Sequence, residues 1–258
     1  MITRVRDTSY FQPHSGMVTM ERLDKYLASR GCGSRREVQQ LVKGGAVTVD
    51  GAVCRQPDCK LDPDSAVVAV NGQAVGDKYL YLMLNKPAGV VSATEDKREK
   101  TVIDLLPEPL RRRGLFPAGR LDKDTEGLLI LTNDGDFAHR MLSPKKHVDK
   151  QYIAQLDGEI TEEMIARFAE GIVFADGVKC LPAKLRIAEN GDKTVGRVTI
   201  CEGKFHQVKK MFAVCGLRVV HLQRISIGNL YLDGKLPIGS YKSLTNLEIQ
   251  QIFIGKIH

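Results

Sequence analysis

Residues 119–130 read Gly-Arg-Leu-Asp-Lys-Asp-Thr-Glu-Gly-Leu-Leu-Ile, a charged loop that runs into an apolar segment. Asp122, Asp124 and Glu126 crowd the loop, and the glycines on both sides permit tight backbone turns. One interpretation is a charged surface loop. Another is a cation site, although the stretch lacks the length and turn residues of a calcium loop. Because the chain has no dinucleotide fingerprint, P-loop or nucleophile elbow, local spacing alone assigns no chemistry.

The region around this loop, residues 79–258, mixes strands and helices. Apolar runs predict strands at 79–84, 128–131, 148–156, 182–187, 195–201 and 219–225. Helical periodicity predicts helices at 101–106, 134–142, 161–170, 204–214 and 244–251. Runs of strands interrupted by single helices indicate an α+β domain with a mainly antiparallel sheet, not a doubly wound parallel one.

A small module precedes this domain at residues 20–66. Its first helix is predicted from the apolar face formed by Leu23, Tyr26 and Leu27. Ser34 opens a second helix, and Glu37 three residues later completes a capping box. A short strand then runs into an Asp50-Gly51 turn. The module is therefore two short helices followed by small strands.

The remaining segments are a tail and a linker. Residues 1–19 are predicted to be a polar, flexible tail, with Met17 or Met20 as a possible natural start. Residues 67–78 are rich in turn residues and are predicted to be a linker. The expected order is thus tail 1–19, small module 20–66, linker 67–78 and large domain 79–258.

Composition narrows the class of protein only broadly. The 258 residues carry a net charge of +7, which suits a polyanionic partner without proving one. The six cysteines form no zinc-type spacing, so reduced thiols in a cytoplasmic protein are expected. No apolar run approaches the roughly 18 residues of a membrane span, so no membrane association is expected.

Basic residues dominate the helices of the small module. Between residues 22 and 43 only Asp24 and Glu37 offset six cations, namely Arg22, Lys25, Arg30, Arg35, Arg36 and Lys43. A solvated helix face and a phosphate-contacting surface both fit this pattern. The runs at 22–27, 34–37 and 47–51 resemble the small RNA-binding domain named after ribosomal protein S-four. That resemblance implies a helix pair whose basic face binds structured RNA.

Four ordered motifs in the large domain resemble the RsuA-type pseudouridine synthases. The stretch at 119–128 is similar to the active-site signature of that family, and residues 85–90 (Asn-Lys-Pro-Ala-Gly-Val) to its first core motif. Residues 150–152 (Lys-Gln-Tyr) resemble the block that carries the active-site tyrosine, and residues 202–211 resemble the late motif. The resemblance implies a pseudouridine synthase fold and an isomerase that needs no metal and no cofactor.

The resemblance also implies roles for single residues. Asp122 matches the catalytic aspartate, which either attacks the nucleotide or removes a ribose proton. Lys209 matches the basic residue that pairs with this carboxylate and opposes the cost of burying its charge. Tyr152 matches the tyrosine that stacks on the base, and Arg120 the residue that fills the space of a flipped uridine. By spacing alone, Lys209 would be a surface lysine and Tyr152 a core tyrosine.

Further residues of the same motifs are expected to contact RNA. The set is Arg22, Lys25, Arg35, Arg36, Asn85, Lys86, Lys204 and Lys210 in addition to Arg120. His206 and Gln207 are expected to be structural or to orient the RNA.

The expected substrate is ribosomal RNA, bound by a monomer. The His-Gln-Val-Lys form at 206–209 resembles family members that modify one uridine of 16S rRNA, uridine 516 in the family's rRNA numbering. Two alternatives stay open at this point: a 23S rRNA synthase of the same family, and a non-catalytic rRNA-binding assembly factor.

Overall fold

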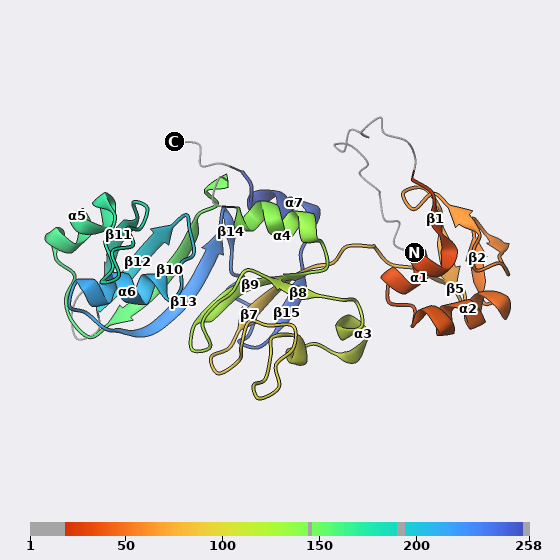
Figure 1. The fold of residues 1–258 in the computed structure, drawn as a ribbon, viewed down its shortest axis with the longest axis horizontal. Helices are drawn as coiled ribbons and strands as arrows, with labels where there is room; N and C mark the ends of the chain where they lie inside the picture. Colours follow the sequence, from red (N-terminus) through yellow and green to blue (C-terminus); the bar gives the residue numbers. More distant parts are fainter. Residues whose placement is uncertain (1–18, 144–145, 190–193, 255–258) are drawn as a thin grey trace. The chain divides into compact units, whose positions relative to one another are not determined.

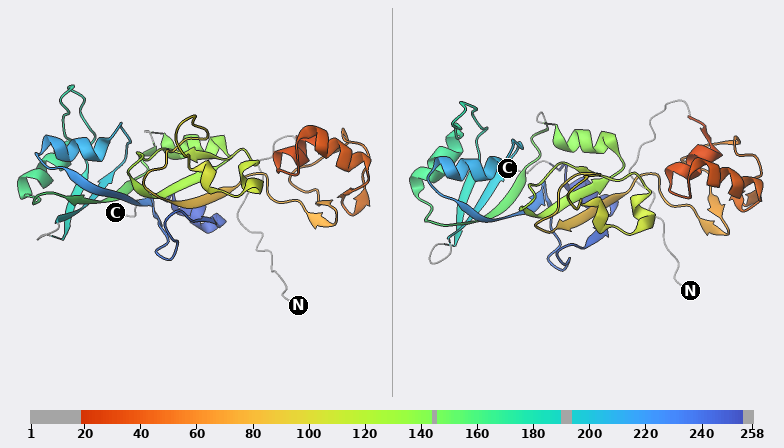
Figure 2. Two further views of the ribbon diagram at one scale, coloured as in Figure 1. Left: turned by 90° about the horizontal axis from the view of Figure 1, so that it is seen from below. Right: turned by 60° about the horizontal axis from the view of Figure 1, so that its bottom comes forward.

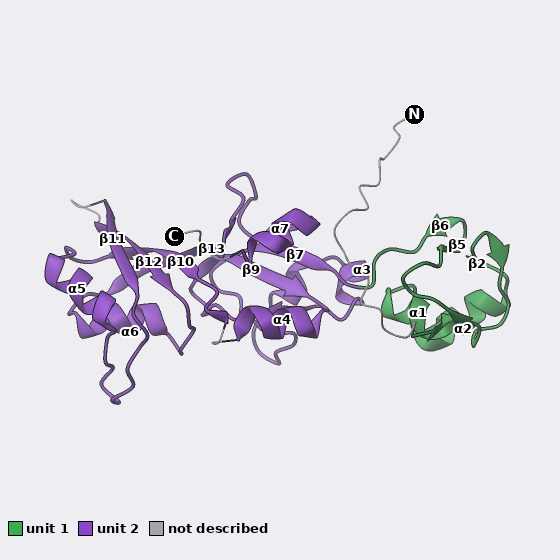
Figure 3. Cartoon of the chain, turned by 90° about the horizontal axis from the view of Figure 1, so that it is seen from above, with its two compact units in different colours: residues 1–78 green, residues 79–258 purple. Residues whose placement is uncertain are grey.

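The computed structural model describes residues 19–143, 146–189 and 194–254. They form two compact units, a small unit that ends at Lys78 and a large unit that begins at Tyr79 (Figure 3). The tail predicted at 1–19 lies, except for its last residue, outside the described residues.

The small unit contains two helices and two small sheets (Figure 1). Its elements are β1 (Glu21–Arg22), α1 (Leu23–Ser29), α2 (Arg35–Lys43), β2 (Val47–Val49), β3 (Ala52–Val53), β4 (Lys60–Leu61), β5 (Val68–Val70) and β6 (Gln73–Ala74). The capping box predicted for the second helix is present. The Ser34 hydroxyl accepts from the Glu37 amide at 3.4 Å, and the Glu37 carboxylate accepts from the Ser34 amide at 2.7 Å.

The segment predicted to be a linker is instead part of the small unit's sheet. Strands β5 and β6 pair with each other, and β5 also pairs with β2. Asn71 and Gly72 join them with φ angles of 51° and 77°, the positive values that a tight two-residue hairpin turn requires. The turn residues that suggested a linker therefore close a hairpin whose strands are too short to show an alternating pattern.

In the large unit, nine strands of the described chain form one sheet in the order β11-β12-β10-β13-β9-β7-β15, with β14 on β13 and β8 on β9. Its strands are β7 (Tyr81–Lys86), β8 (Phe116–Ala118), β9 (Glu126–Thr132), β10 (Lys150–Leu156), β11 (Lys184–Glu189), β12 (Thr194–Ile200), β13 (Val219–Ile227), β14 (Leu230–Tyr231) and β15 (Tyr241–Ser243). Its helices are the 3-10 turn η1 (Ile103–Leu105), α3 (Glu108–Arg111), α4 (Gly135–Leu142), α5 (Glu162–Glu170), α6 (Gln207–Val214) and α7 (Asn246–Gln251).

A narrow seam joins the two halves of this sheet. Strands β9 and β13 pair in parallel over two residue pairs, Glu126 with Gln223 and Gly127 with Arg224, whereas the other described pairings within the sheet are antiparallel. Figure 1 shows β11, β12, β10 and β13 on one side of the seam and β9, β7 and β15 on the other. The predicted α+β class with a mainly antiparallel sheet is confirmed.

Two apolar cores lie on the opposite faces of the sheet. On one face α5 and α6 pack against β10 and β12 (Figure 2), with the rings of Phe168 and Phe212 at a centroid distance of 5.0 Å. On the other face α4 packs against β7 and β9, and Ile252, just after α7, joins that core. Of the helices that the structure describes, none is long and apolar enough to cross a membrane.

Two predicted helices differ from the structure. The helix predicted at 204–214 begins only at Gln207, because His206 has a φ of 53° and the Gln207 side chain bonds back to Glu202 at 2.7 Å and to the Lys204 amide at 2.9 Å. The helix predicted at 101–106 is the single turn η1, which is flanked by Pro107. The predicted list also omits the short elements α3, β8, β14 and β15.

Candidate active site

One buried lysine binds the backbone of the loop between β8 and β9. Lys86 Nζ lies 2.9–3.2 Å from the carbonyl oxygens of Pro87, Asp122, Lys123 and Thr125. Its side chain has no exposed surface, and burial lowers its pKa to about 8, opposed by the nearby carboxylates. The ammonium group therefore fixes the backbone that carries Asp122.

Lys209 reaches this loop from the first turn of α6. Its Nζ lies 3.0 Å from Asp122 Oδ2 and 2.5 Å from Asp124 Oδ1. His206 Nε2 lies 3.6 Å from the other Asp122 oxygen. The Asp122 side chain is 24% exposed, so it can still meet a ligand from solvent while its charge is balanced.

Asp124 and Lys209 stabilise each other's charged forms. Burial by itself would lower the pKa of Lys209, but its bonds to Asp124 and Asp122 outweigh burial and raise that pKa. The hydrogen bond from Lys209 holds the pKa of Asp124 below its usual range. The cation beside Asp122 and Asp124 in this structure is therefore the Lys209 ammonium.

Tyr152 completes the cavity beside Asp122. The ring lies on β10, on the face covered by α6, and is 8% exposed. The lining mixes apolar side chains, among them Leu222, Ile200 and Val208, with Tyr152 and with charged side chains such as Asp122 and Arg120. The Asp122 carboxylate and an aromatic ring therefore line the same small cavity.

Arg224 lies behind Tyr152, and the sequence analysis did not select it. Its guanidinium donates to the Leu128 carbonyl at 2.7 Å and, over a long 3.5 Å, to the Tyr152 hydroxyl. It thus links β9, which follows the Asp122 loop, to β10. Burial, together with the charge of Arg224, lowers the pKa of neighbouring Lys150 to about 8. An arginine on the inward-facing side of a predicted strand was the signal available in the sequence.

Of three further cations predicted to contact RNA, Lys210 follows Lys209 on α6, whereas Arg120 and Lys204 line the cavity. Arg120 is exposed and lines it directly. Lys204 also lines it and pairs with Glu202, while Lys210 Nζ lies 5.3 Å from the ring centre of Phe205. Phe205 is 71% exposed and stacks on His206, and the sequence analysis did not single it out.

Asn85 and Lys86 do not lie on the surface, and the prediction that they contact RNA is wrong for both. Asn85 is 5% exposed, and its amide donates to the Leu236 carbonyl at 2.9 Å. Asn85 and Lys86 are the last two residues of β7, and residues Leu82 to Lys86 of this strand are all buried. Lys86 supports the Asp122 loop, and Asn85 holds the segment around Leu236.

The four cations predicted to bind RNA in the small unit differ in their surroundings. Lys25, Arg35 and Arg36 are exposed. Arg22 is tied to Asp24 through two bonds of 3.0 and 2.9 Å, and these bonds hold the pKa of the fully buried Asp24 down to about 2. Arg35 reaches the same carboxylate over a longer 3.8 Å. Arg22 and Arg35 therefore help to hold Asp24, whereas Lys25 and Arg36 are exposed.

Known families match both units. The family of RNA pseudouridylate synthases matches residues 80–214, and the S4 domain matches residues 21–67. Among solved structures, a pseudouridylate synthase crystal structure superposes with a TM-score of 0.64 at 35% identity and covers 90% of this chain and 99% of its own.

Curated relatives match over nearly their full lengths. An uncharacterized RNA pseudouridine synthase of Bacillus subtilis is 50% identical over 230 residues, which are 88% of this chain and 96% of the relative. The ribosomal small subunit pseudouridine synthase A of Escherichia coli is 39% identical over 234 residues, 90% of this chain and 99% of the relative.

The site and the relatives agree on the chemistry. The cavity presents a charge-balanced carboxylate and an aromatic wall, and four motifs of one family surround it in order. The chain therefore belongs to the RNA pseudouridine synthase family, with an N-terminal S4 domain, and isomerises uridine to pseudouridine in RNA.

Proposed function

We propose that the chain modifies one uridine of 16S rRNA, uridine 516 in the family's rRNA numbering. The observation that carries the proposal is the Asp122–Lys209 ion pair of 3.0 Å at the cavity lined by Tyr152. The small-subunit target is supported by the His-Gln-Val-Lys sequence at 206–209 and by relatives named ribosomal small subunit pseudouridine synthase A, 39% identical to this chain.

In the proposed reaction the bond between N1 of uracil and C1′ of ribose breaks, and a bond between C5 and C1′ forms. Asp122 either attacks the nucleotide or removes a ribose proton to give a glycal. Both routes need an ionised carboxylate, and Lys209 supplies its counter-charge. The proton on C5 must leave and N1 must gain one, so the overall atom count is unchanged. Tyr152 stacks on the base, and its hydroxyl takes up the C5 proton as it passes its own proton to solvent, from which N1 is protonated.

The uridine must leave its base stack to reach Asp122, because chemistry at C1′ inside an RNA helix is sterically blocked. Arg120, exposed at the cavity mouth, enters the helix and holds the vacated space. Lys204 and Lys210 contact flanking phosphates, and Lys25, Arg35 and Arg36 of the small unit bind the same RNA elsewhere. The proposed enzyme acts as a monomer on rRNA or on a small-subunit assembly intermediate.

The test is chemical mapping of pseudouridine in both rRNAs from a strain that lacks the gene. The strain is complemented with the wild type, with Asp122→Asn, or with Asp64→Asn as a control on an exposed acid of the small unit. We expect loss of one 16S site that the wild type and Asp64→Asn restore and Asp122→Asn does not. Loss of a 23S site instead would move the target to the large subunit. Unchanged pseudouridine in both rRNAs would contradict the assignment of this chain to either one.

A further inference from the structure

A second concave site lies on the face of the large unit's sheet opposite to Asp122. It is a cleft of about 480 Å³, a size typical of ligand sites. Thr199 and Cys201 line this cleft, whereas Ile200, between them, lines the catalytic cavity. Neighbouring residues of a strand point to opposite faces, so the two sites lie back to back across β12.

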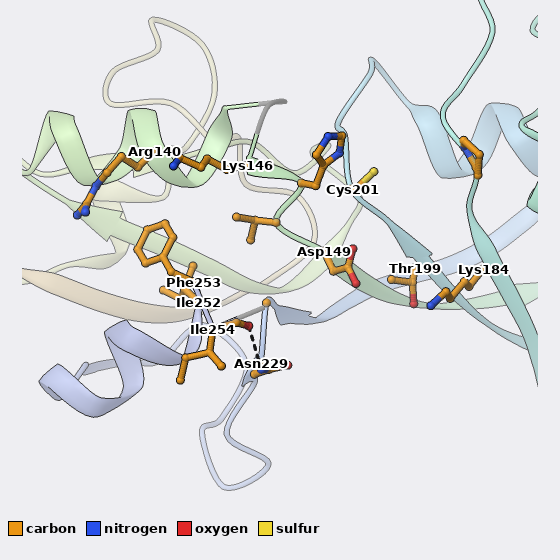
Figure 4. A pocket seen from close by; sticks show the side chains of 14 residues that line it. Arg140, Lys146, Asp149, Lys184, Thr199, Cys201, Asn229, Ile252, Phe253 and Ile254 are labelled. Carbon is orange, nitrogen blue, oxygen red and sulfur yellow. Dashed lines mark hydrogen bonds between the residues drawn. The ribbon is translucent and has the colours of Figure 1, made fainter. Parts of the chain in front are cut away.

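The cleft is rich in cations that form no ion pair with the described residues of the chain. Arg140, Lys146 and Lys184 line it and are exposed, and Asp149 is the acid among the lining residues. Within the described residues none of these three cations forms an ion pair; Arg140 instead lies 5.1 Å from the ring centre of Phe253. In Figure 4, Arg140 and Phe253 lie at one end of the cleft and Lys184 at the other, with Lys146 along the upper wall.

The positive charge continues beyond the cleft onto the open face of β11 and β12. Arg186 and Arg197 are exposed and lie directly opposite each other across the two strands. Lys184, two residues before Arg186 on the same face, is paired with Thr199 of the cleft. Like charges opposite each other destabilise a sheet unless an anion neutralises them. We call Arg140, Lys146, Lys184, Arg186 and Arg197 the far-face basic surface.

We propose that the far-face basic surface binds the phosphate backbone of the substrate RNA, at a site separate from the uridine pocket. The inference rests on the proposed function, which makes rRNA the substrate. The five cations can bind phosphates. Phe253 and Ile254 form an apolar wall of the cleft and are 36% and 46% exposed, so a sugar or base can pack against them. A free mononucleotide would fill the cleft but would leave the Arg186–Arg197 pair uncovered, so the geometry favours a continuing RNA strand.

The RNA on this face would be the segment that flanks the target uridine, where the RNA strand passes the edge of the sheet. Each phosphate contact releases counterions, so the site adds affinity that falls with salt. It adds no base-specific contact, and its effect is on RNA affinity and not on the chemical step.

The test compares the full-length wild type with Arg140→Gln/Lys146→Gln/Lys184→Gln, titrated with 16S and 23S rRNA transcripts at several salt concentrations. The control is Arg167→Gln/Arg218→Gln/Lys235→Gln, which removes the same charge elsewhere on the large unit. At about 0.7–0.9 per lost phosphate contact, the slope of log K against log salt should fall by about 2 in the first variant. Affinity at physiological salt should fall about ten-fold or more, and the control should keep the wild-type slope.

A second variant, Arg186→Gln/Arg197→Gln, guards against misfolding. It should reduce the slope by about 1.5 while its thermal unfolding midpoint stays at or above the wild-type value, because a like-charge pair is removed. Wild-type slopes and affinities in both variants would overturn the inference, as would an equal loss in the control. Pseudouridine mapping of the wild type is scored separately, so failure of the proposed 16S target is distinguishable from failure of the far-face site.

Discussion

Lys86 shows how a buried charge can hold the backbone of the Asp122 loop. Its Nζ lies within 3.2 Å of four carbonyl oxygens, three of them in the segment from Asp122 to Thr125. A buried carbonyl that loses its donor costs about 1–3 kcal/mol. The lysine is therefore a positioning residue, and the position of Asp122 depends on it.

We expect Lys86→Met to fill the same space while removing the ammonium donor from all four carbonyls. Those of Asp122 and Lys123 keep one backbone donor each, the amides of Thr125 and Gly89. The free energy of unfolding should fall by about 2–4 kcal/mol, and the single-turnover rate on saturating rRNA should fall at least ten-fold, because Asp122 loses its fixed position. Lys123→Met, on the exposed neighbour in the same loop, is the control and should change either quantity little. Equal effects of the two substitutions would show that the carbonyl cluster does not hold the loop.

Asp24 allows a prediction about acid stability. Its pKa is lowered from 3.8 to about 2 by Arg22, despite burial. A lowered carboxylate pKa contributes stability above the unfolded value near 4, and that contribution disappears as pH falls from about 4 to 2. The shift corresponds to about 2 kcal/mol at pH 7. Asp24→Asn should therefore unfold more easily than the wild type at pH 7, with the difference shrinking toward pH 2.

Thermal unfolding of the full chain across this pH range measures the effect. Asp64→Asn provides the comparison, because Asp64 is an exposed acid of the same unit. If the difference in stability between Asp24→Asn and the wild type stayed constant down to pH 2, the ionised, Arg22-bound form of Asp24 would not be the cause of that difference.

Among the elements, the seam between β9 and β13 controls how the Asp122 loop and Tyr152 meet. Gly127 has a φ of 100°, and a Cβ there would lie 2.2 Å from the Arg224 carbonyl oxygen. Gly127→Ala must therefore push the two strands apart and separate the Asp122 loop from Tyr152. We expect a loss of about 3 kcal/mol or more in denaturant unfolding and a lower single-turnover rate.

Gly135→Ala is the matched control for the seam. Gly135 begins α4, and a Cβ there meets no atom within 4 Å. Alanine in a helix is more favourable than glycine by up to about 1 kcal/mol, so this variant should be as stable as the wild type or more so. A Gly127→Ala protein that unfolds like the wild type would contradict the close approach of β9 and β13.

The elements also show what the sequence can and cannot predict. Long periodic segments such as α4 and β10 were predicted to within about two residues, since each shows many apolar positions on one face. The strands β8 and β15 have three residues each, too few for a pattern. Asp122, Lys209 and Tyr152 were selected through motif resemblance, and the structure brings their elements together. Whether Lys86 supports the loop or contacts RNA depends on whether its side chain is buried. Burial results from tertiary packing, which no local sequence pattern contains.

At the scale of the whole molecule, the charge of +7 is distributed over both units. In the small unit, Lys25, Arg35 and Arg36 are exposed on or beside the two helices. The large unit adds Arg120 and Lys204 at the Asp122 cavity and the far-face basic surface. RNA affinity is therefore expected to be a sum of salt-sensitive contacts from separate places, whereas catalysis depends on one cavity.

The small unit's share of that affinity can be measured in the intact chain. Lys25→Gln/Arg35→Gln/Arg36→Gln should lower the slope of log K against log salt by about 2, at about 0.7–0.9 per lost phosphate contact. Because these residues lie in a different unit from Asp122, the single-turnover rate at saturating rRNA should stay at the wild-type value. The charge-matched Arg167→Gln/Arg218→Gln/Lys235→Gln protein should change neither. If the small-unit variant lost rate at saturation while its salt slope was unchanged, the S4 domain would be acting on the chemical step and not on binding, and the separation of affinity from catalysis would be wrong.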